Sequence, residues 1–330
     1  MSLQNLTIGK KIALGFGFLF VLLIGVATIA YTALGGAGRR LEMFSTSAQE
    51  TYTAVSLESS MQGLKLQVNE FLATGSAESI AACEAARKAL DAELARAAEL
   101  IVEPARAAQV AKARELLATY NAAFGDLVAN HKARVAIEND VLTPSSKTIA
   151  EGLQSMLAQA RTQGDMNAAF QISNGLGAFY ECMSLANAFL LTSDAPKAVA
   201  AREALATTVS QIERMQQDQL EMEKLDASLK DEAKTQLLAS LRQTAETYRE
   251  GLDKVVAGHQ ARAKILAERI NRVAPEFTAA LARVKTAVHA YQQELQDRTQ
   301  TEQKRNEFVV FVITAVGLGA GAIAAWLITR

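Results

Sequence analysis

The sequence predicts an all-α protein, in which six helices form two stacked four-helix bundles between two transmembrane helices. Half of the 330 residues are apolar and only four are proline, while the helix-forming residues Ala, Leu, Glu, Gln, Arg and Lys dominate. Uncharged apolar runs lie near both ends of the chain, and patterns between them occur twice in the same order. With a net charge of −1 and interspersed acids and bases, the chain has no basic field that would attract nucleic acid.

We place the transmembrane helices at residues 12–34 and 307–328. Each contains the roughly 20 apolar residues that an α-helix needs to cross the hydrocarbon core of a bilayer. The apolar runs within them, residues 12–34 and 308–328, contain no charged residue, which argues against a pore or a transport site. A secretory signal is the alternative interpretation of the first run, because Lys10 and Lys11 precede it, although the apolar part of a signal is only about 7–15 residues long.

Two spans leave one large segment, residues 35–306, on one side of the membrane. The short ends, residues 1–11 and 329–330, then lie together on the other side. Lys10 and Lys11 favour the cytoplasm for that side, although basic residues also flank the other ends of the spans. The function of the chain therefore depends on the large segment.

Helix-ending and helix-capping residues divide this segment into six helices. Gly75, Gly164 and Ser193 suit the ends of helices, and Pro104 suits a first helical turn. A capping residue, Asp226, marks a break before the last helix. The expected helices span residues 39–74, 77–102, 104–163, 166–192, 195–224 and 228–328.

The six helices form a repeat of two short helices and one long helix. The repeated pairs are residues 69–75 with 187–193 and residues 120–134 with 248–262. In the second pair a tyrosine precedes a histidine by eleven residues each time, Tyr120 before His131 and Tyr248 before His259. Because both pairs occur in the same order, we interpret the repeat as structural.

Such a repeat packs as two bundles, each with two short helices and half of each long helix. The expected membrane-proximal bundle comprises about residues 39–135 and 270–306, and the distal bundle comprises about residues 136–269. Pro144 and Pro275 fall within the long helices, where a proline removes a hydrogen bond. Kinks are therefore expected near the junction of the bundles.

No arrangement of residues indicates catalysis. The chain contains no HExxH, CxxC or phosphate-binding loop, and its three histidines have no nucleophile at a recognisable spacing. Cys83 and Cys182 are too few for a zinc site and are expected as free thiols in different bundles. We therefore expect no catalytic residues, no cofactor and no metal site.

Binding residues are expected among polar side chains on the inward stripes of the helices, where burial requires a partner. Helical spacing places Arg87 beside Cys83 and Leu90 on one stripe, and Arg202 beside Leu205 on another. An arginine level with a tyrosine suits an organic acid, because guanidinium binds carboxylate bidentately. The alternative is that these arginines lie at the edge of the stripe and reach water, or form structural pairs. The expected ligand-binding residues are Lys65, Arg87 and Tyr120 in one bundle and Asn187, Arg202 and Tyr248 in the other.

His131, Arg134, His259 and Arg262 are secondary candidates. Each histidine lies on an apolar stripe, and an arginine follows it three residues later. Imidazole titrates near neutrality, so a pH-responsive or anion-binding role is one interpretation. A hydrogen-bonded structural role is the alternative that we favour.

Three short motifs carry a resemblance to a known family. Residues 5–18 run from a polar lead through Thr7-Ile8-Gly9-Lys10-Lys11 into Leu14-Gly15-Phe16-Gly17-Phe18, and Phe-Leu-x-Thr turns occur at residues 71–74 and 189–192. The first motif resembles the start of methyl-accepting chemotaxis receptors, and the paired turns with the six-helix layout resemble their helical bimodular sensor domain. The resemblance implies a chemoreceptor of the bacterial inner membrane, whose periplasmic domain binds a small organic acid or similar metabolite. Met183 stands where the resemblance implies a basic residue.

A full receptor of this family continues past its second span into a HAMP linker and a signalling coiled coil, whereas this sequence stops at Arg330. We therefore expect a fragment, a truncated paralogue or a subunit that acts through a full-length receptor partner. We also expect a homodimer. The sensor part of a membrane histidine kinase is an alternative, and so is a membrane-anchored helical scaffold that binds a protein and no metabolite.

The two spans are expected to play different roles. The segment from Glu276 to Val316 contains neither Gly nor Pro, so the last helix is expected to run unbroken into the second span. Gly35, Gly36 and Gly38 instead predict a flexible join after the first span. The second span is therefore the expected moving part.

Overall fold

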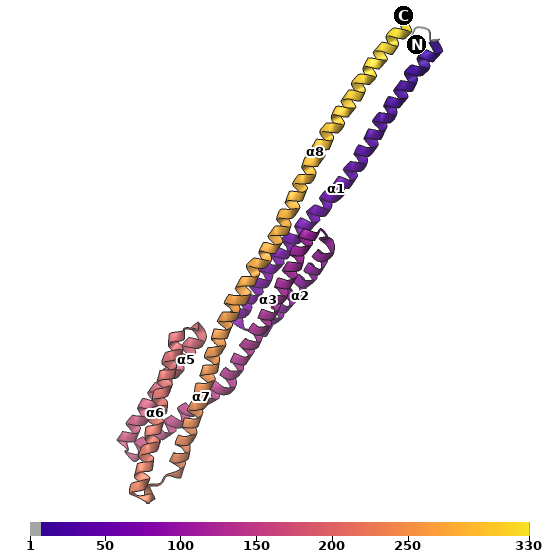
Figure 1. Cartoon of the computed structure of the whole chain (residues 1–330). Coiled ribbons are helices and arrows are strands. Elements are labelled where there is room, and N and C mark those ends of the chain that lie inside the picture. Colours follow the sequence, from indigo (N-terminus) through magenta and orange to yellow (C-terminus); the bar gives the residue numbers. More distant parts are fainter. Residues whose placement is uncertain (1–7, 330) are drawn as a thin grey trace. The chain divides into compact units, whose positions relative to one another are not determined.

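The chain is all-α, as the sequence predicts. In this computed structural model, which describes residues 8–329, nearly every described residue is helical and none lies in a strand (Figure 1). The elements are α1 (Ile8–Thr74), α2 (Ala77–Leu100), α3 (Pro104–Ile137), the π-helical turn η2 (Glu138–Leu142), α4 (Thr143–Gln163), α5 (Met166–Thr192), α6 (Ala195–Leu225), the 3-10 turn η3 (Ala227–Leu229), α7 (Glu232–Ile265), the π-helical turn η4 (Leu266–Ile270) and α8 (Asn271–Thr329). Joined through their π-helical turns, these elements form the six expected helices.

Most helix ends fall where local chemistry predicts them. Gly75, Gly164 and Ser193 adopt left-handed backbone conformations with φ of 62°, 73° and 57°. A residue in this conformation ends a helix, because the backbone N–H groups that follow can bind the last helical carbonyls. The Asp165 side chain accepts a hydrogen bond from the Ala168 N–H and caps α5. The last boundary differs from the prediction: α7 begins at Glu232 instead of residue 228, because a short 3-10 turn precedes it.

The chain divides into two compact units, each built from four helical segments. The first unit contains α1 up to Ala73, the segment Ala81–Leu117 and the chain from Ala274 onward. The second unit contains Thr74–Ile80 and Ala118–Val273. Residues 118–135, which the sequence assigned to the proximal bundle, therefore belong to the second unit. The reason is that side chains of this stretch contact α7 and the turn at Gly75.

The first unit has a core of apolar side chains that recur every three or four residues along each helix. In α8 this stripe passes through Phe277, Leu281, Val284 and Val288, all fully buried. The other helices contribute Leu57, Met61, Leu64, Val68, Phe71, Leu90, Leu94, Ala97, Val110, Ala113 and Leu117. Burial of one large aliphatic side chain contributes about 1.5–3 kcal/mol, so this core fixes α8 against the other three helices.

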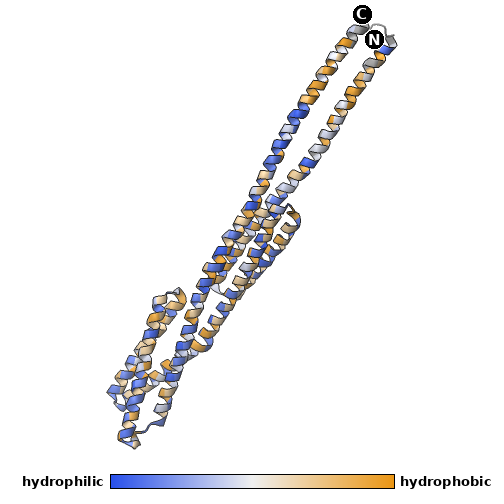
Figure 2. Ribbon diagram, viewed as in Figure 1, coloured by the Kyte–Doolittle hydropathy of each residue, from blue (hydrophilic) through white to orange (hydrophobic). Residues whose placement is uncertain are grey.

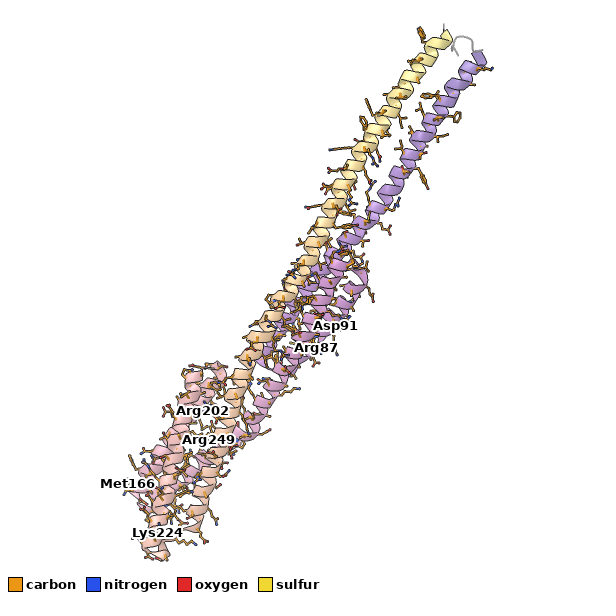
Figure 3. The ribbon with its side chains drawn as sticks, in the orientation of Figure 1. Arg87, Asp91, Met166, Arg202, Lys224 and Arg249 are labelled. Carbon is orange, nitrogen blue, oxygen red and sulfur yellow. The ribbon has the colours of Figure 1, made fainter. Side chains whose placement is uncertain are left out.

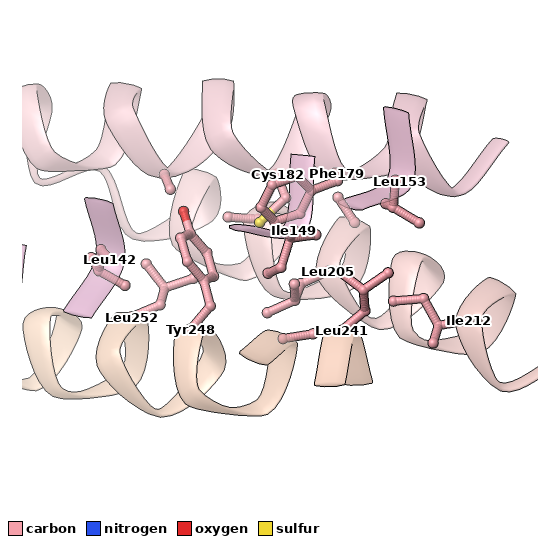
Figure 4. Close-up of a cluster of buried hydrophobic side chains, with 14 of the residues drawn as sticks. Leu142, Ile149, Leu153, Phe179, Cys182, Leu205, Ile212, Leu241, Tyr248 and Leu252 are labelled. Carbon is pink, nitrogen blue, oxygen red and sulfur yellow. The ribbon is translucent and has the colours of Figure 1, made fainter. Parts of the chain in front are cut away.

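The second unit has its own core, in which α4, α5, α6 and α7 pack as a closed bundle (Figure 4). Large side chains fill its centre, and alanines line much of α6. The core includes Leu142, Ile149, Leu153, Phe179, Cys182, Ala201, Leu205, Ile212, Leu241, Tyr248 and Leu252. Cys83 and Cys182 are buried free thiols in different units, which confirms the prediction of unpaired cysteines.

The prolines of the long helices follow π-helical turns. Thr143, which precedes Pro144, donates its backbone N–H to the carbonyl of Glu138, five residues back. Asn271, four residues before Pro275, donates to the carbonyl of Leu266 in the same way. A π-helical turn widens the helix locally, and such turns often lie at functional sites. The two turns occupy equivalent places in the repeat, since each begins seven residues after a histidine.

Within the described part of the chain, two helices are long and apolar enough to cross a membrane. Figure 2 shows apolar residues at the N-terminal end of α1 and at the C-terminal end of α8. Within the first unit these ends lie close together, because a side chain added at Gly317 would contact Leu22. The prediction of a flexible join after the first span is wrong. Helix α1 is continuous through residues 35–38, since a glycine weakens a helix by only about 1 kcal/mol and the neighbouring residues favour it.

Candidate functional site

Two histidines of the second unit, related by the repeat, each contact the residue that follows the end of a helix: Gly75 after α1 and Ser193 after α5. Nε2 of His131 lies 3.1 Å from the carbonyl oxygen of Gly75. Nδ1 of His259 lies 2.8 Å from the hydroxyl oxygen of Ser193. A side chain at position 75 would overlap the His131 ring, so glycine is needed there for space as well as for its positive φ. The repeat therefore extends to tertiary contacts.

His259 also contacts Arg134, and this contact fixes the form of its ring. The two partners, Nη1 of Arg134 and Nε2 of His259, are 2.6 Å apart. A guanidinium group only donates hydrogen bonds, so Nε2 must accept, and Nδ1 carries the proton and donates to Ser193. Burial, followed by the charges of Arg134 and Arg262, lowers the pKa of His259 to about 4. His259 is therefore neutral at physiological pH.

Arg134 is a buried cation without a carboxylate partner. Only 8% of the residue is exposed, and no described carboxylate forms an ion pair with it. Its Nε atom is buried and has no hydrogen-bond partner. Burial and the nearby charge of Arg262 lower its pKa, while Glu138 acts in the opposite direction. The side chain thus has unused capacity to bind an anion.

Close packing of α3 against α7 holds this cluster in place. A side chain at Gly258 would approach the Cδ and Cγ atoms of Arg134 to 2.7 Å, and Nδ2 of Asn130 donates to the Gly258 carbonyl over 3.1 Å. The Phe189 ring lies 4.9 Å from the His259 ring, centroid to centroid. Glycine at position 258 therefore lets the arginine lie directly against the α7 backbone. The secondary candidates Arg134 and His259 are brought together, and Arg262 is close enough to influence both.

The predicted pair of Arg202 and Tyr248 does not form. Tyr248 is buried against the edge of Phe179, with ring centroids 5.7 Å apart, and burial raises its pKa. Arg202, labelled on α6 in Figure 3, keeps 39% of its side chain exposed. It forms an ion pair with Asp253 at 2.6 Å. The inward stripe of α6 instead passes through Ala198, Ala201 and Leu205. The prediction of an inward Arg202 is wrong, because alanine, and not arginine, occupies the closely packed face.

The remaining predicted binding residues occupy different environments. Arg87 is half-buried on α2, in the first unit, whereas Tyr120 is buried in the second. Lys65 and Asn187 are exposed on α1 and α5. Tyr120 is therefore at an inward position, whereas Arg87, like Arg202, is only partly buried.

A second buried polar group lies in the first unit and was missed by the sequence analysis. Arg106 forms an ion pair with Glu50 at 3.0 Å, and both residues are almost fully buried. The guanidinium carbon of Arg106 also lies 5.4 Å from the centre of the Tyr291 ring, an attractive cation–π arrangement. These contacts join α1, α3 and α8. The sequence feature that could have predicted this pair is Glu50, a charged residue at an inward position one turn before Ala54.

An open groove lies between α1 and α8 in the same unit. Apolar residues of α1, including Ile29 and Phe44, line one side, and glutamines of α8, including Gln296 and Gln303, line the other. Arg40, which also lines the groove, forms an ion pair with Glu302. The groove therefore lacks an unpaired buried cation of the kind found at Arg134.

The sequence matches no protein-family model and no curated protein.

Among the described residues, no three His, Cys, Asp or Glu side chains gather in a way that could hold a metal ion. The cluster around Arg134 can bind an anion.

Proposed function

We propose that the chain is the sensor module of a transmembrane chemoreceptor, similar to methyl-accepting chemotaxis receptors with a helical bimodular domain. It binds a small metabolite, with an organic acid as the favoured class, in the periplasm. Binding shifts the last helix by about 1–2 Å, the scale typical of helix shifts at interfaces. The module lies in the inner membrane of a bacterium as a two-pass homodimer.

The observation that carries this proposal is the continuity of α8. From Ala274 onward the helix belongs to the first unit, in whose core Phe277 and Leu281 are fully buried, and it runs without a break to Thr329. An α-helix rises about 1.5 Å per residue and resists compression along its axis. A displacement of its packed end is therefore passed to the apolar end.

Charge supports an anionic ligand. Arg87 is half-buried on α2, and no described carboxylate forms an ion pair with it. Guanidinium binds carboxylate through two parallel charge-assisted hydrogen bonds. An organic acid fits this group better than a neutral or cationic metabolite does.

Thermal unfolding of the full chain in detergent, with a panel of organic acids, amino acids and amines, tests the proposal. A ligand at 100 times its dissociation constant should stabilise the protein by about 2.7 kcal/mol. Arg87→Ala should reduce this stabilisation, whereas Arg96→Ala, an exposed arginine on the same helix, should leave it unchanged. Stabilisation by no metabolite, together with specific binding of a protein, would favour a scaffold and overturn the sensor proposal.

Orientation in the membrane is tested separately. Both native cysteines are buried, so Met166→Cys, at an exposed position before the core of α5, provides one accessible thiol. A thiol reagent that cannot cross the inner membrane should label it in intact cells. Labelling only after the inner membrane has been opened would place the large segment in the cytoplasm.

A further inference from the structure

Arg106 joins three helices of the first unit at one point. The residue belongs to the first turn of α3, and its guanidinium forms an ion pair with Glu50 of α1 at 3.0 Å. The guanidinium carbon also lies 5.4 Å from the centre of the Tyr291 ring of α8. Tyr291 follows Val288, the last residue of the buried stripe of α8. The contact therefore lies where α8 leaves the core of the unit.

The attachments of Arg106 to its neighbours differ in strength. Glu103 caps α3, because its carboxylate accepts hydrogen bonds from the backbone N–H groups of Ala105 and Arg106. The ion pair with Glu50 is almost fully buried, and breaking a buried pair leaves an uncompensated charge. A cation–π contact is much weaker than such a pair. α1 and α3 therefore hold Arg106 in place, and the contact with Tyr291 breaks first when α8 moves.

Space for a second position of the Tyr291 ring lies beside it. A pocket of about 450 Å³ is lined by Tyr291, by Arg40 and Met43 of α1, and by α8 residues between 294 and 302. These α8 residues all follow Tyr291 in the chain, so the pocket extends from the ring toward the second span. The Tyr291 hydroxyl already reaches the sulfur of Met43 over 3.4 Å. A shift of α8 toward the membrane carries the ring away from Arg106 and into this space.

Two other ion pairs between α8 and α1 can follow such a shift. Lys285 pairs with Glu58, and Arg40 pairs with Glu302. Lys285 and Arg40 are partly exposed, and their long side chains have many rotamers, so each can keep its partner while α8 moves slightly. Arg106 differs from them because Glu50 already fixes its guanidinium.

We propose that Arg106 is a positioning residue for α8. Through the ring of Tyr291 it sets the position of α8 in the chain without ligand, and loss of this contact lets α8 move about 1–2 Å toward the membrane. The inference rests on the proposed sensor function, in which a shift of this helix carries the signal, and it identifies the contact that opposes the shift. A ligand then has to break only a weak contact, because the buried ion pair stays intact in both positions.

The depth of Trp326 in the bilayer tests this role. It is the only tryptophan of the sequence and lies on α8, near the far end of the second span. The full chain is placed in phosphatidylcholine vesicles, and its fluorescence is quenched by lipids brominated at different depths along their acyl chains. Tyr291→Leu removes the ring and should move Trp326 about 1–2 Å away from the bilayer centre. Tyr291→Phe keeps the ring and should leave the depth unchanged. Tyr52→Leu, which removes an exposed ring from α1, is the matched control and should also leave it unchanged.

The role of the ion pair is tested by replacing both partners, because removal of Arg106 alone would leave Glu50 buried without its counter-charge. Glu50→Leu combined with Arg106→Met fills similar space with apolar atoms, a change that buried pairs often tolerate. Circular dichroism establishes that the double variant is folded. It should move Trp326 as far as Tyr291→Leu does. Adding Tyr291→Leu to it should give no further movement, because both changes remove the same contact.

The outcomes separate this inference from the proposed function. An unchanged depth in Tyr291→Leu overturns the positioning role, and an equal movement in Tyr291→Phe assigns that role to the hydroxyl contact with Met43 instead. Movement of Trp326 toward the bilayer centre contradicts the direction in which the pocket lies. If metabolites stabilise the chain but Tyr291→Leu leaves the depth unchanged, the sensor function stands without this contact. If Tyr291→Leu moves Trp326 and no metabolite stabilises the chain, the positioning role stands and the sensor function fails.

Discussion

His259 is neutral in the folded chain because its surroundings leave no place for a second proton. Arg134 donates to Nε2, and Nδ1 donates to Ser193. A proton on Nε2 would break the first bond and place two cations in contact. This geometry, together with burial, accounts for a pKa of about 4, well below the ordinary value of about 6.5.

A lowered pKa makes stability depend on pH at this residue. Between pH 6.5 and 4 the unfolded chain binds a proton that the folded chain does not, so His259 destabilises the fold as pH falls. The slope is about 1.4 kcal/mol per pH unit, and the total is on the order of 3 kcal/mol. Denaturant unfolding at several pH values should show a weaker dependence for His259→Gln, whose amide oxygen still accepts from Arg134. His289→Gln, at an exposed position, should behave as the unchanged chain; an unaltered slope in His259→Gln contradicts the neutral assignment.

At the scale of the helices, local sequence sets where each helix ends, and packing sets which side it buries. The ends at Gly164 and Ser193 agree with the prediction because a left-handed residue stops a helix wherever it occurs. The buried face of α6 does not agree, since small alanines let its neighbours approach and leave Arg202 outside. Apolar spacing alone cannot choose between adjacent stripes when the residues are mostly alanine.

Two glycine helix ends provide a matched test of these contacts. Gly75 and Gly164 both have positive φ, but only Gly75 has a ring, that of His131, in the space of a side chain. Gly164→Ala should destabilise the chain by about 1–2 kcal/mol, the penalty of the left-handed conformation. Gly75→Ala should destabilise it by about 1–3 kcal/mol more, because the His131 ring must move. Equal losses in thermal unfolding would show that the contact with His131 is not formed.

At the scale of the whole molecule, each unit has its own apolar core and its own buried cation. In the first unit, Arg106 is paired with Glu50; burial raises the pKa of Glu50, and Arg106 counteracts this rise. In the second unit, Arg134 has a neutral partner. The two buried cations therefore differ in the charge of the group that they contact.

Separate cores predict that damage to one unit stays largely within it. Glu50→Gln leaves Arg106 buried without its charged partner and should destabilise the first unit by about 3 kcal/mol. Hydrogen exchange should then speed up in peptides that contain residues 54–71 and 277–288, and much less in those that contain residues 149–160. Asp253→Asn, which breaks an exposed pair in the second unit, should change stability by less than about 1 kcal/mol. A uniform rise in exchange across both units would indicate a single cooperative fold.

The sequence by itself determined the helical class, the six helices, the positions of most of their ends and the two apolar spans. These properties depend on composition, capping residues and uninterrupted apolar length, which act over a few neighbouring residues. It also indicated the repeat, whose histidines do occupy equivalent contacts.

Only the tertiary structure decided which polar side chains meet. Arg134 and His259 are 125 residues apart, and their contact depends on how closely α3 approaches α7 at Gly258. The contact between Glu50 and Arg106 likewise depends on how their helices pack. So does the outward position of Arg202. Helical periodicity defines a stripe of about 100°, whereas a hydrogen bond requires placement within a few tenths of an ångström. That precision comes from the packing of whole helices.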